Sequence, residues 1–312
     1  MYQAVIIGAG NIASEFDSPD NPNILTHAHA YQHNPAFHLK GFYDTDYKKA
    51  KKAADKWKCK AYETLEAAMT DTDVVSCCVP DQYHAQILKD VSVYHPNLVI
   101  AEKPFAVSIT EGNNLQRIFT SKIPLLLNYS RRFLPEFQML RKKVKHYGKF
   151  LKGVGYYGKG ILHNGSHMID LLIFLFGCVG CQEILHPKLY DYMNDPSVDT
   201  VLNISEGTFH MVAIDSRIAT VFELDLFFEK ARIRILNGGT IIEKYELQMS
   251  STYHDYYNYV LTKRETVNYS HAMTGLIGNA EGFLDGTQEL ACDMEDGINV
   301  LKICMQIRGE SF

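Results

Sequence analysis

The chain has 312 residues, of which 46% are hydrophobic and 21% charged, and its formal net charge is −5. This composition is that of a globular chain rather than a disordered one, and the length suits two domains of roughly 100–200 residues each. Because nucleic-acid-binding surfaces are basic, the negative net charge leads us to expect no nucleic-acid partner.

The apolar runs and the cysteines predict a cytoplasmic protein with no membrane partner. Residues 1–7 form an apolar run without a basic flank that stops at Gly8, too early for an export signal. The longest later apolar run, residues 169–177, is too short to span a bilayer. The seven cysteines are scattered and odd in number, which suits a reducing compartment. Cys178-Val179-Gly180-Cys181 has no second pair to complete a zinc site, so we interpret its thiols as buried or loop thiols and expect no metal.

Strand-like and helix-like stretches alternate in the first half of the chain. Strands are predicted at residues 3–7, 39–43, 73–79, 97–101 and 123–127, and helices at 46–58 and 83–93. Strands that alternate with helices form parallel sheets with helices on both faces. We therefore predict an α/β Rossmann domain, with a doubly wound parallel sheet, over residues 1–127.

Past about residue 150 the pattern changes to successive strand-like runs. They cover residues 201–205, 208–214, 219–228, 231–236 and 240–247, and Gly238-Gly239 is a turn signal between the last two. Short turns between strands predict a mainly antiparallel sheet, so residues 128–312 are expected to form an α+β domain. We allow for a C-terminal helix that packs back on the first domain. The tyrosine-rich run 253–259 suits a sugar pocket, a subunit interface or the surface of an irregular helix.

A glycine-rich turn follows the first predicted strand directly. Its residues are Gly8-Ala9-Gly10-Asn11-Ile12-Ala13. Glycines suit such a turn because the backbone bends sharply and lies against a pyrophosphate, where a side chain would collide. The helix expected after the turn directs N–H groups and its positive end toward the phosphates. The turn therefore predicts a dinucleotide site.

Asp44 terminates the second predicted strand and indicates which dinucleotide binds. Its carboxylate can accept hydrogen bonds from ribose hydroxyls and repels a 2′-phosphate, so we expect NAD(H) and regard NADP as less favoured. The separation from Gly8 to Asp44 exceeds the usual ~20 residues. We interpret the excess, residues 14–26, as a loop inserted into or after the first helix, and we assign no catalytic role to residues 26–31.

The segment Ala101-Glu102-Lys103-Pro104-Phe105 follows the fourth predicted strand, at the strand end where doubly wound sheets bind ligands. Together with the glycine turn it resembles the glucose–fructose oxidoreductase/inositol dehydrogenase/MocA (Gfo/Idh/MocA) family of NAD(P)-dependent sugar and polyol oxidoreductases. Further segments resemble that family in the expected order, so that the resemblance covers nearly the whole chain. They are Val79-Pro80-Asp81-Gln82-Tyr83-His84, Asn128-Tyr129-Ser130-Arg131-Arg132-Phe133 with Pro135, Gly160 to Asp170, and Met294-Glu295-Asp296-Gly297.

The resemblance implies a Rossmann domain followed by a domain with an open, mainly antiparallel sheet that mediates oligomerisation, so we expect a homodimer or homotetramer. It also implies that Lys103 and His167 are catalytic and lie near the substrate carbon that gives or takes hydride. Lys103 can stabilise an alkoxide, and His167 can shuttle the hydroxyl proton near neutral pH. The residues implied on the nicotinamide ribose side of the cofactor are Pro80, His84 and Glu102, and Val79 and Lys103 are also expected to bind the cofactor.

One position departs from the family pattern. The family has an Asp four residues before its catalytic histidine, and this chain has His163 there. A histidine can hydrogen-bond a hydroxyl but supplies no fixed negative charge, so His163 indicates a different substrate or a member without catalysis. The predicted substrate-binding residues are His163, Arg132, Tyr129 and Asn164, although Arg131 and Arg132 equally suit a solvated pair.

The leading hypothesis is reversible hydride transfer between NAD(H) and a secondary alcohol or ketone of a sugar, polyol or sugar nucleotide. Two alternatives stay open. One is a non-catalytic member that senses a cofactor or a sugar, which the departure at His163 motivates. The other is a reductase of a non-sugar carbonyl.

Overall fold

The computed structural model describes residues 1–119, 123–185 and 187–310 and divides into two compact units. Unit 1 comprises Met1–Leu134 and Tyr269–Leu301, and unit 2 comprises Pro135–Asn268 and the chain from Lys302 onward. This division differs from our predicted boundary after residue 127, because a late segment of the chain returns to unit 1. None of the helices within the described ranges combines the length and the apolar run that a membrane crossing requires.

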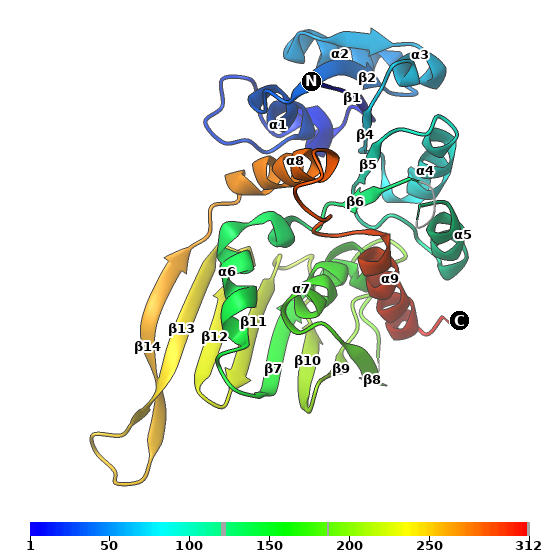
Figure 1. Cartoon of the computed structure of the whole chain (residues 1–312). Helices are drawn as coiled ribbons and strands as arrows, with labels where there is room; N and C mark the ends of the chain where they lie inside the picture. Colours follow the sequence, from blue (N-terminus) through cyan, green and yellow to red (C-terminus); the bar gives the residue numbers. More distant parts are fainter. Residues whose placement is uncertain (120–122, 186, 311–312) are drawn as a thin grey trace. The chain divides into compact units, whose positions relative to one another are not determined.

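Unit 1 is built around a six-stranded sheet with the order β3-β2-β1-β4-β5-β6, and its neighbouring strands all run parallel (Figure 1). This is the order of a doubly wound Rossmann sheet, so the predicted fold class is confirmed. The strands are β1 (Tyr2–Ile7), β2 (Phe37–Tyr43), β3 (Lys60–Tyr62), β4 (Val74–Cys77), β5 (Leu98–Ala101) and β6 (Leu125–Leu127). The helices and turns are η1 (Asn11–Glu15), α1 (His27–His33), α2 (Tyr47–Trp57), α3 (Leu65–Met69), η2 (Asp81–Tyr83), α4 (His84–Ser92), α5 (Ile109–Phe119), η3 (Ser130–Phe133), α8 (Ser270–Leu284) and the first part of α9 (Met294–Arg308).

The central strands of this sheet carry apolar side chains on both faces. β4 and β5 are buried at every residue, as is typical of parallel strands that are covered on both sides. All five predicted strands of this half occur, whereas the pattern did not indicate β3, which has only three residues. The late segment joins the sheet directly, because the N–H of Leu127 in β6 donates to the Cys292 carbonyl at 2.9 Å.

The loop inserted after the glycine turn is held by one buried carboxylate, that of Asp17. Its Oδ2 accepts the N–H of Leu25 at 2.6 Å and lies 2.9 Å from Nδ1 of His29. Its Oδ1 accepts the hydroxyl of Thr26, the N-cap residue of α1, at 2.6 Å. The predicted loop is therefore present. The helix that we expected directly after the turn is only the five-residue π-helical turn η1, because the loop interrupts it.

Unit 2 is built around an eight-stranded sheet with the order β14-β13-β12-β11-β7-β10-β9-β8. β7 and β10 pair in parallel and the other neighbouring strands are antiparallel, so the predicted sheet type is confirmed. The strands are β7 (Phe150–Tyr157), β8 (Gly180–Ile184), β9 (Thr200–Ile204), β10 (Gly207–Ala213), β11 (Phe222–Phe228), β12 (Ala231–Leu236), β13 (Ile241–Met249) and β14 (Tyr257–Thr266). The helices and turns are α6 (Pro135–Val144), η4 (Gly160–Gly165), α7 (Ser166–Phe176), η5 (Asn237–Gly239) and the last part of α9.

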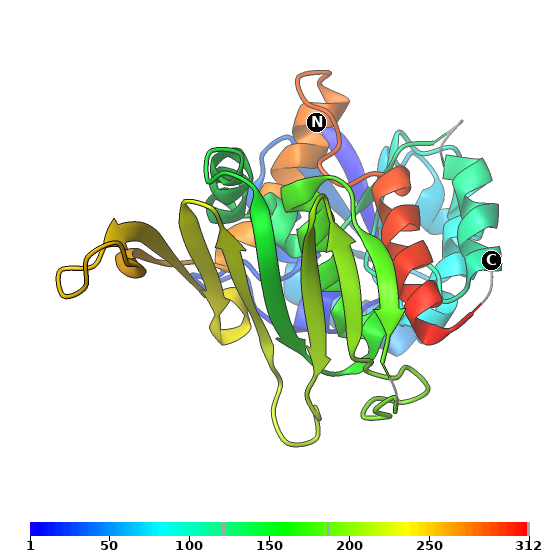
Figure 2. The same cartoon turned by 90° about the horizontal axis from the view of Figure 1, so that it is seen from below.

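The sheet of unit 2 has one buried and one partly exposed face. Figure 1 shows α6 and α7 over one face, and Figure 2 shows the twisted sheet, green to yellow, from below. Packing on α7 is close: a Cβ atom at Gly155 would lie 2.5 Å from the Met168 sulfur. In β11 and β12 buried residues alternate with half-exposed ones, the pattern of a sheet with one covered face.

Three strands of unit 2 were not predicted, namely β7, β8 and β14. The tyrosine-rich run 253–259 is no irregular helix, which corrects one of our three interpretations. Tyr253 and Tyr256 lie in the exposed connection that follows β13, and Tyr257 begins β14. The alternation of aromatic and polar residues in Tyr257–Tyr259 suits a strand, and pairing with β13 decides it.

Candidate functional site

The glycine turn lies at the C-terminal end of β1. Gly8 has a φ of +92°, and a Cβ atom there would lie 2.4 Å from the Cys78 carbonyl oxygen, so only glycine fits. Gly10 has an extended backbone with a φ of −84°, and an added Cβ would meet no described heavy atom within 4 Å. The space beside Gly10 is therefore not filled by the described part of the chain and has room for a phosphate group.

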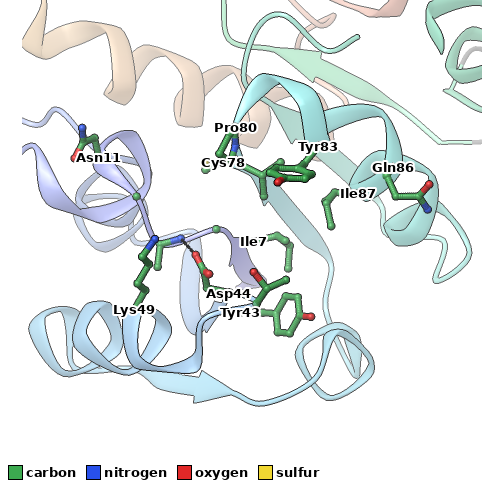
Figure 3. Close-up of a pocket in the computed structure, with 15 residues that line it drawn as sticks. Ile7, Asn11, Tyr43, Asp44, Lys49, Cys78, Pro80, Tyr83, Gln86 and Ile87 are labelled. Atoms are coloured by element: carbon green, nitrogen blue, oxygen red, sulfur yellow. Dashed lines mark hydrogen bonds between the residues drawn. The ribbon is translucent and has the colours of Figure 1, made fainter. Parts of the chain in front are cut away.

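A cavity of about 590 Å³ opens beside this turn (Figure 3). Its volume is in the range of cofactor sites, and it lies at the ends of β1, β2 and β4, where doubly wound sheets bind ligands. The predicted cofactor residues that line it are Gly8, Ala9, Gly10, Asn11, Asp44, Val79 and Pro80. The predicted cofactor residues Ile12, His84, Glu102 and Lys103 are not part of its lining.

Asp44 directs its carboxylate at the glycine turn. Oδ2 accepts the N–H of Ala9 at 2.9 Å, and Oδ1 accepts the N–H of Asp46 at 2.9 Å. Each oxygen of a carboxylate can accept more than one hydrogen bond, so both keep capacity for ribose hydroxyls. Lys49 lines the same cavity from α2, and its side chain rises toward the turn (Figure 3). The cavity thus carries one negative and one positive side chain beside the glycine turn.

Glu102, directly after β5, is held by two donors on one oxygen. Its Oε1 lies 2.9 Å from Nε2 of His27 and accepts the Asn128 side-chain amide at 2.7 Å. Burial acts to raise the pKa of Glu102, but His27, Asn128 and the charge of Lys103 together hold that pKa below its usual value. The carboxylate is therefore ionised near neutral pH, and Oε2 accepts no hydrogen bond from a described residue.

The hydrogen bonds continue from His27 into the core of unit 1. Nδ1 of His27 lies 3.1 Å from the Ser76 hydroxyl, which lies 2.8 Å from the Tyr31 hydroxyl. His27, Ser76 and Tyr31 are each fully buried. Because an ionised Glu102 only accepts, Nε2 of His27 is the donor of that pair. The chain of contacts ties α1 and β4 to the segment that contains Lys103.

Lys103 lies in the turn after β5, and His84, the first residue of α4, contacts the same turn. Lys103 is half-buried, and its ammonium group acts electrostatically on Glu102. His84 is fully buried, and its Nδ1 donates to the Pro104 carbonyl at 2.6 Å. Its Nε2 has no hydrogen-bond partner within the described ranges. His84 therefore supports the backbone of this turn from behind.

Arg132 is committed to an ion pair within unit 1. Its two terminal nitrogens donate to the two carboxylate oxygens of Asp296 at 2.8 and 3.0 Å, and one also donates to the Ala291 carbonyl at 2.9 Å. Both Arg132 and Tyr129 are buried. A bidentate pair of this kind fixes the guanidinium group. The ion pair thus gives Arg132 a structural role, and its predicted role in substrate binding stays a prediction, as does that of Tyr129.

The remaining predicted residues gather in unit 2, where η4 leads into α7. His163, Asn164 and His167 are half-exposed in a stretch whose neighbours are buried. The His163 ring lies 4.6 Å from that of Tyr192, centroid to centroid, and Asn164 donates to the Gly158 carbonyl at 2.9 Å. His163 and His167 do not share one regular helix, because the π-helical turn η4 ends between them. Turns of this type are frequent at functional sites.

Several residues of the sites escaped the sequence analysis. They are Lys49, His27, Tyr31 and Ser76. A signal existed for two of them: His27 and Tyr31 are four residues apart and so share one face of a helix. Lys49 lies five residues after Asp44 in a lysine-rich helix, and nothing in that pattern distinguishes it from its solvated neighbours.

The fold and the cavity define unit 1 as a dinucleotide-binding Rossmann domain. Comparison with known proteins agrees: residues 2–127 match the Gfo/Idh/MocA family model, described as an oxidoreductase family with an NAD-binding Rossmann fold. No curated protein matches the chain in sequence.

Solved structures resemble the chain over nearly its whole length. The UDP-N-acetylglucosamine 3-dehydrogenase GnnA from Acidithiobacillus ferrooxidans matches with a TM-score of 0.76 and 16% identity, over 99% of this chain and 97% of that one. An oxidoreductase from Agrobacterium radiobacter in complex with NAD+, L-tartaric acid and magnesium has a TM-score of 0.77 and 15% identity, over 99% and 95%. A 3-ketoreductase from Actinomadura kijaniata in complex with NADP has a TM-score of 0.75 and 13% identity, over 99% and 97%.

The resemblance drawn from the motifs is thereby confirmed over residues 2–127, which match the model of the Gfo/Idh/MocA oxidoreductase family. The structural likeness extends the fold to the second unit. The matched family is one of oxidoreductases, and it binds NAD(P).

Proposed function

We propose that this protein is an NAD(H)-dependent oxidoreductase that transfers hydride to or from a secondary alcohol or ketone of a sugar, polyol or sugar nucleotide. The cavity beside the glycine turn carries the proposal, because its open space at Gly10 fits a phosphate and a side chain there would fill it. The names of structural relatives, a sugar-nucleotide dehydrogenase and a ketoreductase among them, support the substrate class.

NAD(H) is the proposed cofactor because of the charge at the adenosine end. Backbone amides of the turn from Gly8 to Asn11 would hold the pyrophosphate, and Asp44 would accept the ribose hydroxyls and oppose a 2′-phosphate. Lys49 would offer such a phosphate a positive charge, so the preference is moderated. Replacing Asp44 with Asn keeps an acceptor for the Ala9 amide and removes the charge. If dissociation constants for NADH and NADPH keep the same ratio in this variant, the assignment of Asp44 is wrong.

Bound NAD(H) supplies the hydride acceptor or donor; the side chains of the chain handle the oxygen. Lys103 would stabilise the developing alkoxide by charge and hydrogen bonding. His167 would take or return the hydroxyl proton. Glu102, ionised and fixed through Oε1, would present Oε2 to a ribose hydroxyl of the cofactor. These roles follow the family resemblance.

Replacement of Lys103 tests this function. Lys103→Ala should lower turnover on an identified substrate by at least about a hundredfold, in line with the loss of a group that stabilises transition-state charge. Absorbance of the reduced cofactor, followed with a panel of keto-sugars and sugar nucleotides, measures it. The control is Lys89→Ala, an exposed lysine of α4 in the same unit. Wild-type turnover in Lys103→Ala would refute the mechanism.

The second candidate function is a non-catalytic sensor of cofactor or sugar, favoured by His163 in place of the family's Asp. Such a protein would bind NADH without oxidising it in the presence of any carbonyl compound. Oxidation that depends on Lys103 rules this out. Activity confined to carbonyl compounds outside the sugar panel would instead identify a reductase of non-sugar carbonyls.

A homodimer or homotetramer is proposed to form on the partly exposed face of the unit 2 sheet. On this face Arg232 and Arg234 pair with Asp225 and Glu243, and apolar side chains such as Tyr156 stand beside them. Because the charges are already paired within the face, a second copy can cover it without burying unpaired charges. The cytoplasm is the proposed location, since all seven cysteines are free thiols, which suits a reducing compartment.

A further inference from the structure

The backbone that carries His163 is fastened residue by residue to the loop that precedes β9. The amides of five consecutive residues donate to this loop. The Lys159 amide donates to Asp191 Oδ2 at 2.8 Å, and the Gly160 amide donates to Ser197 Oγ at 2.9 Å. The Ile161 amide donates to the Pro196 carbonyl at 2.9 Å. The amides of Leu162 and His163 both donate to Asp195 Oδ2, at 3.0 and 2.8 Å. The loop therefore determines where η4 presents its side chains.

The Asp195 carboxylate lies so close to this backbone that position 160 has no room for a side chain. Gly160 has a φ of +79°, and a Cβ atom there would lie 2.1 Å from Oδ2 of Asp195. Glycine at position 160 is thus what admits the carboxylate beneath the turn. A carboxylate that accepts two successive backbone amides is a strong anchor, because each bond is assisted by its charge.

The imidazole of His163 is placed by the same loop. Its ring packs on the ring of Tyr192, three residues before Asp195. The Lys159 ammonium lies 5.5 Å from the centroid of the same Tyr192 ring. Further titratable groups that act on Asp195, or on which it acts, are Tyr157 on β7 and Cys304 and Arg308 on α9, and Arg308 is also paired to Glu310. Burial raises the pKa of Asp195, and the charges of Arg308 and His163 counteract this.

We propose that Asp195 supplies, from the loop, the negative charge that the family resemblance places at position 163. It is a positioning residue: it fixes the turn through the amides of Leu162 and His163 and is electrostatically coupled to the His163 imidazole. An imidazole N–H held at this place suits a substrate that presents an oxygen acceptor, a carbonyl or an anionic group, at this point. Only this last step, the role toward substrate, rests on the proposed function.

The coupling is tested by titrating Asp195 in the full chain and following its side-chain carboxyl ¹³C resonance by NMR. The resonance is assigned by its absence from the spectrum of Asp195→Asn. His163→Gln keeps the backbone amide and removes the imidazole charge, so the titration midpoint of Asp195 should rise by at least about half a pH unit. The matched control is His210→Gln on β10, which should leave the midpoint unchanged. An equal midpoint in wild type and His163→Gln overturns the proposal, and this readout needs no substrate.

The positioning role is tested on an identified substrate. Asp195→Asn keeps an acceptor for the two amides but removes the charge, so the pH profile of kcat/KM should move to lower pH, whereas loss of a purely structural bond would lower kcat/KM at every pH. An unmoved profile refutes the positioning role. Failure of the proposed function would show separately, as turnover that survives Lys103→Ala, and it would leave the titration result intact.

Discussion

Gly8 and Gly10 are two residues apart in one turn, yet the structure gives them different reasons to be glycine. Gly8 needs its positive φ and the absence of a Cβ atom beside Cys78. Gly10 has a backbone conformation open to any residue and space beside it. The fold therefore requires glycine at position 8, whereas at position 10 only the proposed phosphate site gives a reason for glycine.

Alanine at each position separates these roles. Gly8→Ala should lower the free energy of unfolding by about 2–4 kcal/mol, from the left-handed backbone and the clash with Cys78. Gly10→Ala should unfold at the wild-type denaturant concentration but bind NADH at least about tenfold more weakly, about 1.4 kcal/mol. Urea unfolding and fluorescence titration measure the two quantities. Normal NADH affinity in Gly10→Ala would show that the phosphate does not lie there.

His27 helps to keep Glu102 ionised, so the free energy of unfolding should depend on pH through this pair. Because the pKa of folded Glu102 lies below its ordinary value of 4.5, its ionisation stabilises the wild type above that pH, and the contribution disappears as pH falls through the folded pKa. In His27→Phe burial should dominate and raise that pKa. The loss of unfolding free energy should thus be about 2–4 kcal/mol near pH 7 and smaller near pH 4.

Urea unfolding between about pH 4 and 7 measures this difference. Tyr31→Phe is the control, because it removes a hydroxyl from the far end of the same chain of hydrogen bonds and touches no carboxylate. Its cost should be about 1 kcal/mol at every pH. A pH-independent cost for His27→Phe as well would contradict the assigned pairing with Glu102.

At the scale of elements, the inserted loop and α1 form one unit with Asp17 at its centre. The carboxylate closes the loop onto the N-cap residue of α1, and α1 in turn supplies His27 and Tyr31. The insertion therefore does more than lengthen the connection between β1 and β2. It determines where the helix that supports Glu102 begins.

Asp17→Ala should accordingly destabilise the protein by about 3 kcal/mol, since several charge-assisted hydrogen bonds are lost in a buried site. It should also weaken NADH binding, because α1 loses its anchor. Thermal unfolding and NADH titration measure both effects. The exposed Asp20 of the same loop provides the control, and Asp20→Ala should match the wild type. Equal behaviour of the two variants would show that the loop is not held by Asp17.

At the scale of the whole molecule, each unit has its own sheet and its own core, and the sheet of unit 2 keeps a half-exposed face. Tyr156 in β7, in the middle of the strand order, is 39% exposed on a strand whose neighbours on both sides are paired. An aromatic side chain in such a place is typical of an interface. This exposed tyrosine is the basis for proposing that a second copy of the chain covers the face.

Tyr156→Glu should therefore convert the proposed oligomer into monomers, because an unpaired carboxylate would be buried in the contact. Light scattering coupled to size-exclusion chromatography measures the molar mass. Met139→Glu, at an exposed position of α6, is the control and should keep the wild-type mass. A monomeric wild type, or an unchanged mass in Tyr156→Glu, would exclude this face as the interface.

The sequence by itself determined the Rossmann strands of the first half, the glycine turn and the family, because these depend on local patterns: apolar runs, glycine spacing and short motifs in order. It could not indicate β3 or β14, whose short or mixed sequences become strands only by pairing. The contact of His27 with Glu102 joins residues 75 apart, and that of Asp195 with the His163 amide joins residues 32 apart. Such contacts depend on how distant segments pack, so only the tertiary structure decided that a histidine fixes Glu102 and that a carboxylate lies beneath His163.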